Sequence, residues 1–145
     1  MPKEREDLKD QIESVSEILA DAVSHPAPTL GIDLDGCCDE SMFFRILTHV
    51  WPGDVIVVTF RRDQEKAVAD LEKYGITFTD VVLVDSFDAK ADVIRERGIA
   101  FYIDDQPEFL RNISPQVGVM LFRNGGNFDF SDKKWMLSSK TGKLI

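Results

Sequence analysis

The hydrophobic pattern alternates between two kinds of segment along most of the chain. Five short runs are apolar at nearly every position and rich in β-branched residues, which is typical of strands buried on both faces of a parallel sheet. They cover residues 29–35, 54–60, 81–85, 100–104 and 117–122. Between these runs, apolar residues recur at helical spacing. The spacing predicts helices over residues 41–51, 62–74 and 89–97, and a short helix from Pro107.

Strands that alternate with helices predict an α/β fold. We expect a three-layer, Rossmann-like domain with a central parallel sheet of about five strands, plus an N-terminal helix. The whole chain, residues 1–145, is expected to form a single domain. Residues 1–27 would form the helix and a linker, and residues 28–123 the core. Residues 124–145 would form a tail or a small hairpin that includes Trp135, Met136, Leu137 and Leu144.

Residues 3–24 predict one long amphipathic helix. Its apolar residues are spaced by four, three, four and three positions and form a narrow stripe: Leu8, Ile12, Val15, Leu19 and Ala22. Such a stripe usually packs against the core of its own domain. The same spacing also suits the seam of a coiled coil. We therefore expect packing on the core, with a homodimer through this helix as the alternative.

Composition indicates a soluble globular protein, since 43% of the 145 residues are hydrophobic and 30% are charged. No apolar stretch is long enough to cross a membrane, and the N-terminus lacks the apolar core of a signal peptide. We therefore expect a cytoplasmic protein that makes no membrane contact. The formal net charge of −9 argues against non-specific binding to nucleic acids. The adjacent Cys37 and Cys38 cannot connect distant segments, and we interpret them as packing residues.

Reactive polar residues follow the predicted strands, at the edge of the sheet where parallel α/β folds bind ligands. They are Asp33 and Asp35 at the end of the first strand, Thr59 and Arg61 at the end of the second, Lys90 a few residues beyond the third, and Asp104 and Asp105 at the end of the fourth. Because side chains alternate along a strand, Asp33 and Asp35 should point to the same side. Two carboxylates held that close need a cation between them or a shared proton. Carboxylates from two strands predict a Mg²⁺ site.

Four ordered segments resemble the motifs of the haloacid dehalogenase-like phosphatase superfamily. Its first motif is similar to residues 32–36 (Ile-Asp-Leu-Asp-Gly), its second to residues 57–59, its third to Lys90, and its fourth to residues 101–105. The order and spacing agree over about residues 29–123. The resemblance implies a Mg²⁺-dependent phosphohydrolase, an enzyme that acts on phosphate monoesters.

The same resemblance implies a role for each strand-end residue. Asp33 would be the nucleophile that forms an aspartyl-phosphate, and Asp35 the general acid and base. The substrate phosphate would be bound by Thr59 and Lys90. Arg61 is a further candidate on a separate ground: a cation near the start of a helix opposes the helix dipole, so it either binds the phosphate or is simply exposed at the surface. The Mg²⁺ ion would be bound by Asp33, the main-chain carbonyl of Asp35, and one of Asp104 and Asp105, of which we favour Asp105.

Two features depart from the pattern of this superfamily. Cys37 stands where the superfamily prefers Thr, and the segments between the motifs are too short for a cap domain. A small, capless member would have an open site that accepts a phosphorylated small molecule or macromolecule. A phosphotransferase would use the same residues. The alternative from another class is a non-catalytic or weakly active relative that keeps the metal site as a binding or assembly module.

Overall fold

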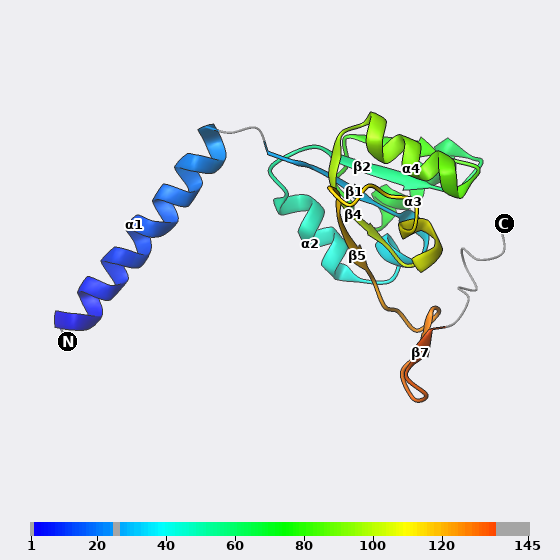
Figure 1. Ribbon diagram of the computed structural model, residues 1–145. Helices are drawn as coiled ribbons and strands as arrows, with labels where there is room; N and C mark the ends of the chain where they lie inside the picture. The colour runs from blue at the N-terminus through cyan, green and yellow to red at the C-terminus, as the bar shows by residue number, and fades with distance from the viewer. Residues whose placement is uncertain (1, 25–26, 136–145) are drawn as a thin grey trace.

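The computed structural model describes residues 2–24 and 27–135 (Figure 1). The helices are α1 (Pro2–Ser24), α2 (Met42–Val50), α3 (Gln64–Lys73) and α4 (Phe87–Glu96). The main strands are β1 (Thr29–Ile32), β2 (Val55–Thr59), β3 (Asp80–Leu83), β4 (Ile99–Asp104) and β5 (Gly118–Leu121). Two short helical turns, η1 (Leu34–Cys38) and η2 (Pro107–Leu110), follow β1 and β4. The order of elements predicted from the sequence is confirmed.

Capping side chains set the helix boundaries. The Ser41 hydroxyl accepts a hydrogen bond from the N–H of Phe43 (3.1 Å), so α2 begins as predicted. Asp63 caps α3, which therefore begins two residues later than the apolar spacing indicated. Ser86 caps α4, which therefore begins two residues earlier than the apolar spacing indicated.

The five strands form one parallel sheet in the order β3-β2-β1-β4-β5. The first strand of the chain therefore lies at its centre, and Ile32 at its end pairs with Val57 on one side and Ile103 on the other. This confirms the predicted α/β class with a central parallel sheet. The carboxyl ends of β1, β2 and β4 are neighbours, which is the condition for their polar residues to meet.

Helices cover both faces of the sheet and complete the three layers (Figure 1). On one face, Phe44 of α2 and Leu71 of α3 pack in a core with Ile32. On the other face, Ile94 of α4 packs with Tyr102. Each of these side chains is almost completely buried. Burial of apolar surface on both faces is the main force that holds the sheet in place.

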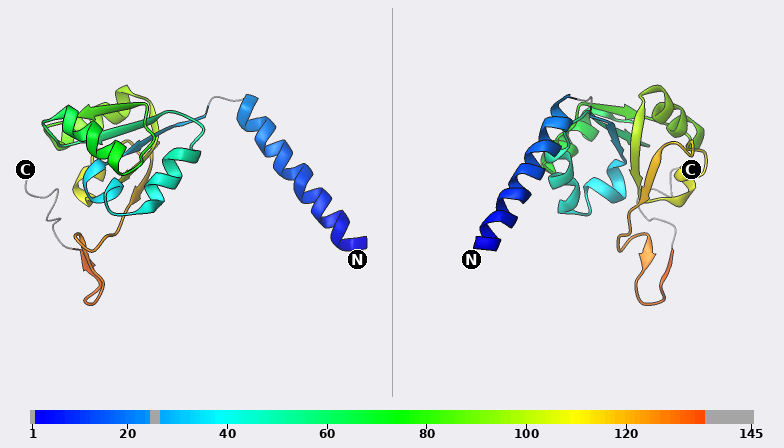
Figure 2. Two further views of the ribbon diagram at one scale, coloured as in Figure 1. Left: turned by 180° about the vertical axis from the view of Figure 1, so that it is seen from behind. Right: turned by 60° about the vertical axis from the view of Figure 1, so that its left-hand side comes forward.

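Helix α1 stands apart from the α/β unit in Figure 1 and in the left view of Figure 2. The side chains of Leu8, Ile12 and Val15 are 57%, 59% and 55% exposed. The expectation that this stripe packs on the core is therefore wrong. Both faces of the sheet already carry their own helices, α2 and α3 on one face and α4 on the other. Leu19 and Ala22 lie outside the described side chains.

After β5, the chain forms a small antiparallel hairpin of β6 (Phe128–Asp129) and β7 (Lys134–Trp135). This confirms the hairpin alternative for the start of the predicted tail. Phe128 and Trp135 make an edge-to-face contact with ring centroids 5.0 Å apart, and the Arg123 guanidinium lies 4.4 Å from the Phe128 ring. Met136, Leu137 and Leu144 lie outside the described residues. The division into a single domain stays a prediction.

Among the residues that the structure describes, no helix combines the length and the apolar character that crossing a membrane would need.

Candidate metal and anion site

The strand-end acids come together because the backbone turns sharply after β1. Asp33 follows the last residue of β1, and its N–H donates to the carbonyl of Ile103 in the adjacent β4 (3.0 Å). Gly36 then adopts a φ of +91°, which few other residues tolerate. A Cβ at Gly36 would lie 2.0 Å from Oδ2 of Asp105. Glycine at this position therefore allows the η1 turn and the Asp105 carboxylate to occupy adjacent space.

Lys90 is the buried cation of the site. The Lys90 Nζ lies 2.7 Å from Oδ2 of Asp104 and 3.2 Å from Oδ1 of Asp33, with all three side chains almost fully buried. Asp104 also accepts hydrogen bonds from the Tyr102 hydroxyl (2.6 Å) and the Gln106 N–H (2.9 Å). Burial alone would lower the pKa of Lys90, but Asp104 and Asp33 raise it above its ordinary value, so the ammonium stays charged.

Several buried oxygens at this edge have no hydrogen-bond partner in the described part of the chain. They are Oδ2 of Asp33, both carboxylate oxygens of Asp105, and the hydroxyl of Thr59. Each of these side chains is at most 2% exposed. Buried polar groups in proteins are nearly always bonded, so this group of oxygens requires an explanation. Asp104 is different, since both of its oxygens are already engaged.

The electrostatics of the site favour a bound cation or a bound proton. Burial raises the pKa of Asp33 well above its ordinary value, and Asp104 and Asp105 raise it further, while Lys90 opposes them. Burial, followed by the charge of Asp104, raises the pKa of Asp105 to about 7. Three carboxylates facing one ammonium leave two negative charges uncompensated when all are ionised. A divalent cation would neutralise both of them.

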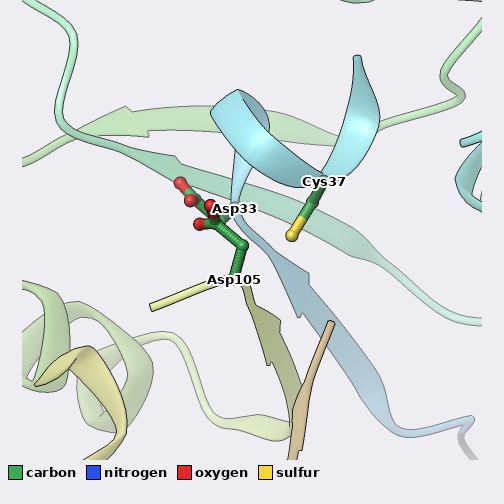
Figure 3. A group of neighbouring side chains, drawn as sticks. All are labelled: Asp33, Cys37 and Asp105. Atoms are coloured by element: carbon green, nitrogen blue, oxygen red, sulfur yellow. The ribbon is translucent and has the colours of Figure 1, made fainter. Parts of the chain in front are cut away.

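Cys37 lies beside the two unpaired carboxylates. Figure 3 shows its side chain projecting from η1 beside the Asp105 side chain, and the carboxylates of Asp33 and Asp105 lie next to each other. One potential ligand atom from each of the three residues lies within 4.8 Å of the others. The sequence interpretation treated this cysteine as a packing residue, and Cys37 does belong to the core of this face. In the sequence, a further role for Cys37 was indicated only by its position directly after the Asp-Leu-Asp-Gly segment.

Asp35 does not join the cluster. Its two carboxylate oxygens accept hydrogen bonds from Nε and Nη2 of Arg61 (2.9 and 2.7 Å), and Arg61 also pairs with Asp70. The expectation that Asp33 and Asp35 share one side of a strand fails because β1 ends at Ile32. The alternation of side chains applies only within the strand, and Asp35 already lies in the η1 turn.

Two asparagines in the loop after β5 connect the segments that carry the acids. Nδ2 of Asn124 donates to the carbonyl of Gly36 (2.6 Å), and Nδ2 of Asn127 donates to the carbonyls of Asp105 (2.6 Å) and Phe122 (2.9 Å). Both side chains are buried. They fix the η1 turn relative to the end of β4. Sequence reasoning missed them, although an Asn-Gly-Gly-Asn stretch after the last main strand marks a structured turn.

The structure thus brings Asp33, Lys90, Asp104 and Asp105 together and places the Thr59 hydroxyl among the buried strand-end groups. It separates the Asp35 and Arg61 side chains, which bind each other, from the buried lysine network. Of the two alternatives at the end of β4, Asp105 is the residue with free oxygens. The roles that we assigned to these residues stay predictions.

No protein-family model matches the chain, and no curated protein matches it. Among solved structures, a universal stress protein in complex with cAMP matches with a TM-score of 0.43 and 13% identity, over 67% of this chain and 98% of that one. The structure of AibC matches with a TM-score of 0.45 and 18% identity, over 70% of this chain and 31% of that one.

These findings overturn the resemblance on which the enzymatic expectations depended. Neither matched structure is a haloacid dehalogenase-like phosphatase, and no family model supports that superfamily. The superfamily assignment is therefore wrong. The expected Mg²⁺-dependent phosphohydrolase with an aspartyl-phosphate at Asp33, and the hydrolase class with it, are likewise not supported.

Proposed function

We propose that this protein binds a divalent metal ion between Asp33 and Asp105, and that the bound ion holds a phosphate-bearing ligand at the carboxyl edge of the sheet. The observation that carries the proposal is the set of buried, unpartnered carboxylate oxygens on these two residues. Carboxylate oxygens are the ligands that Mg²⁺ prefers, so Mg²⁺ is the ion that the oxygen donors favour. The main-chain carbonyl of Asp35 would add a further oxygen.

The donor set fits a metal ion better than it fits an empty pocket. Leaving a buried carboxylate oxygen without any partner costs free energy, and here three such oxygens share one small region. A shared proton would satisfy one contact between Asp33 and Asp105, but it would leave the others unmet. A divalent ion would satisfy oxygens of both residues and cancel the excess charge.

Lys90 and Asp104 support the site without binding the ion themselves. Asp104 holds the Lys90 ammonium, and that ammonium lies 3.2 Å from Oδ1 of Asp33. The lysine therefore fixes the orientation of Asp33, so that its other oxygen, Oδ2, remains available. Lys90 and Asp104 would act as positioning residues in the second layer around the ion.

The charge of the cluster explains why the ligand would depend on the metal. A site with two uncompensated negative charges repels a phosphate group, whereas the same site with a divalent ion does not. The ion would offer its remaining coordination positions to phosphate oxygens, and the buried, unpartnered hydroxyl of Thr59 can donate to one of them. The expected ligand is thus a phosphorylated small molecule or macromolecule.

Isothermal titration calorimetry tests the metal site directly. Mg²⁺ should bind to the wild-type protein, and its affinity should fall below detection in Asp33→Asn and Asp105→Asn. Asp85→Asn, which removes an exposed acid at the end of β3, is the matched control and should bind Mg²⁺ normally. Unchanged Mg²⁺ binding in Asp105→Asn would refute the proposal, and so would a folded wild type that binds no divalent metal ion.

Inorganic phosphate tests the ligand. It should bind only when Mg²⁺ is present, and Thr59→Val should weaken phosphate binding by roughly tenfold while leaving Mg²⁺ affinity unchanged, since a single hydrogen bond contributes about 1 kcal/mol. Phosphate binding of equal strength with and without Mg²⁺ would contradict the proposal that the metal ion binds first and then holds the phosphate.

The cellular compartment of the protein is a proposal as well. We propose a cytoplasmic protein, because its two cysteines are free and buried, as is common in reducing compartments.

A further inference from the structure

We infer that Cys37 supplies a sulfur ligand to the metal site, so that the site prefers a thiophilic divalent ion of the Zn²⁺ and Co²⁺ class over Mg²⁺. This inference rests on the proposed metal site and specifies which ion it holds. The oxygen donors alone favour Mg²⁺, and the thiol is the one donor that changes this preference.

The geometry places the sulfur with the free oxygens rather than elsewhere in the core. One ligand atom each from Asp33, Cys37 and Asp105 lie within 4.8 Å of one another, and all three side chains are buried. Figure 3 shows the thiol projecting from the η1 turn beside the Asp105 side chain, on the backbone segment that follows Asp33. The independent sign of a ligand is the set of unpartnered oxygens on both aspartates.

The adjacent Cys38 shows that this orientation is specific to Cys37. The Sγ of Cys38 donates to the main-chain carbonyl of Asp33 (3.3 Å) and stabilises the turn. Both cysteines are buried, at 0% and 4% exposure, so burial alone does not distinguish them. Cys38 is therefore the matched control for any experiment on Cys37.

The donor set matches the coordination that Zn²⁺ uses when it also binds a ligand. Such sites have three protein ligands in a tetrahedral arrangement and leave the fourth position for water or another ligand. Two carboxylate oxygens and one thiolate would supply the three, and a phosphate oxygen could occupy the fourth. On binding, the Cys37 thiol forms a metal–sulfur bond and releases its proton to solvent, without oxidation or reduction.

Co²⁺ is the probe that tests the inference, because a cobalt–thiolate bond gives a charge-transfer absorption band in the near ultraviolet. Wild-type protein titrated with Co²⁺ should develop this band. Cys38→Ser should retain it and Cys37→Ser should lose it. Competition titrations should show that Cys37→Ser weakens Zn²⁺ binding at least about tenfold, since even residues outside the first shell contribute that much, while Mg²⁺ affinity stays the same.

Protection from alkylation provides a second measurement on the unmodified protein. Zn²⁺ should slow the reaction of Cys37 with iodoacetamide, located by mass spectrometry, even if Cys37→Ser does not fold. Binding of Co²⁺ to the wild type without the charge-transfer band would overturn the inference and leave the proposed function intact. Failure of Mg²⁺, Zn²⁺ and Co²⁺ alike to bind would instead remove the proposed function itself.

Discussion

At the scale of single residues, Asp105 is the group most affected by its surroundings. It lies against Gly36, its carboxylate oxygens have no partner among the described residues, and its pKa is raised to about 7. An unfolded chain would have an Asp pKa near 4. Without metal, the folded protein therefore binds a proton more tightly than the unfolded chain does between about pH 4 and pH 7.

This difference predicts how the stability of the metal-free protein depends on pH. The contribution of Asp105 is fully present below about pH 4 and is lost as pH rises through about 7, because ionisation is then required of a buried carboxyl. We expect the free energy of unfolding in EDTA to fall by a few kcal/mol over this range, about 1.4 kcal/mol for each unit of pKa shift. Urea titrations at several pH values measure it.

Asp105→Asn is the comparison that isolates this contribution. The amide does not titrate, so the variant should lose clearly less stability than the wild type between pH 5 and about pH 8. Parallel curves for the two proteins would show that other groups control the pH dependence.

The sequence could predict which residues gather at the sheet edge, but not how their side chains pair. The apolar runs located the ends of the other four main strands to within two residues, although the first run extended past the end of β1 at Ile32. The parallel order brought Asp33 and Asp105 together as expected. The Asp35–Arg61 pair was not predictable, because it depends on the η1 turn. This turn begins at Leu34, just after β1, and Gly36 within it has a positive φ. Long-range contacts such as that of Asn124 with Gly36 leave no local pattern.

At the scale of elements, α1 differs from α2, α3 and α4, the other described α-helices, because it covers none of the sheet. Its described apolar side chains at residues 8, 12, 15 and 18 are all more than half exposed. Most of the stability of helices in proteins comes from packing of an amphipathic face, so the apolar stripe of α1 is expected to be covered. The acidic residues Asp10, Glu13 and Glu17 occupy other positions of the helical repeat than the apolar stripe. The stripes of two copies of the chain could therefore pack together without burying these charges.

We expect the protein to form a homodimer through α1, as the a/d spacing of its stripe indicates. Size-exclusion chromatography with light scattering should give twice the mass of the 145-residue chain. Ile12→Asp, which places a charge in the seam, should yield a monomer that keeps the circular dichroism of the α/β unit. Ser14→Asp adds the same charge outside the stripe and should stay dimeric. A dimeric Ile12→Asp variant would exclude the helix as the contact.

At the scale of the whole molecule, the sequence pattern was sufficient to predict the fold but not the function. Five apolar strands with intervening helices determined the sheet, and every main strand of the prediction is present. The function did not follow from the same pattern, because polar residues at strand ends are a property of many α/β proteins with different activities. What distinguishes this chain is the local chemistry at the ends of β1 and β4, where a thiol meets two aspartates that each carry a buried oxygen without a hydrogen-bond partner.

Because this cluster joins the two central strands of the sheet, metal binding should stabilise the entire domain. An ion that binds only the folded protein adds about 2.7 kcal/mol at a concentration of 100 times its Kd. For a domain of this size each kcal/mol raises the Tm by roughly 2–4 °C, so an increase of about 5–10 °C is expected. Differential scanning calorimetry with Mg²⁺ or Zn²⁺, and again after excess EDTA, measures the shift and its reversal. Asp105→Asn should show no increase, because it lacks a carboxylate for the ion. An equal increase in the Tm of that variant would show that the metal binds elsewhere in the molecule. The carboxylates of Asp33 and Asp105 would then not be the reason that metal stabilises the sheet.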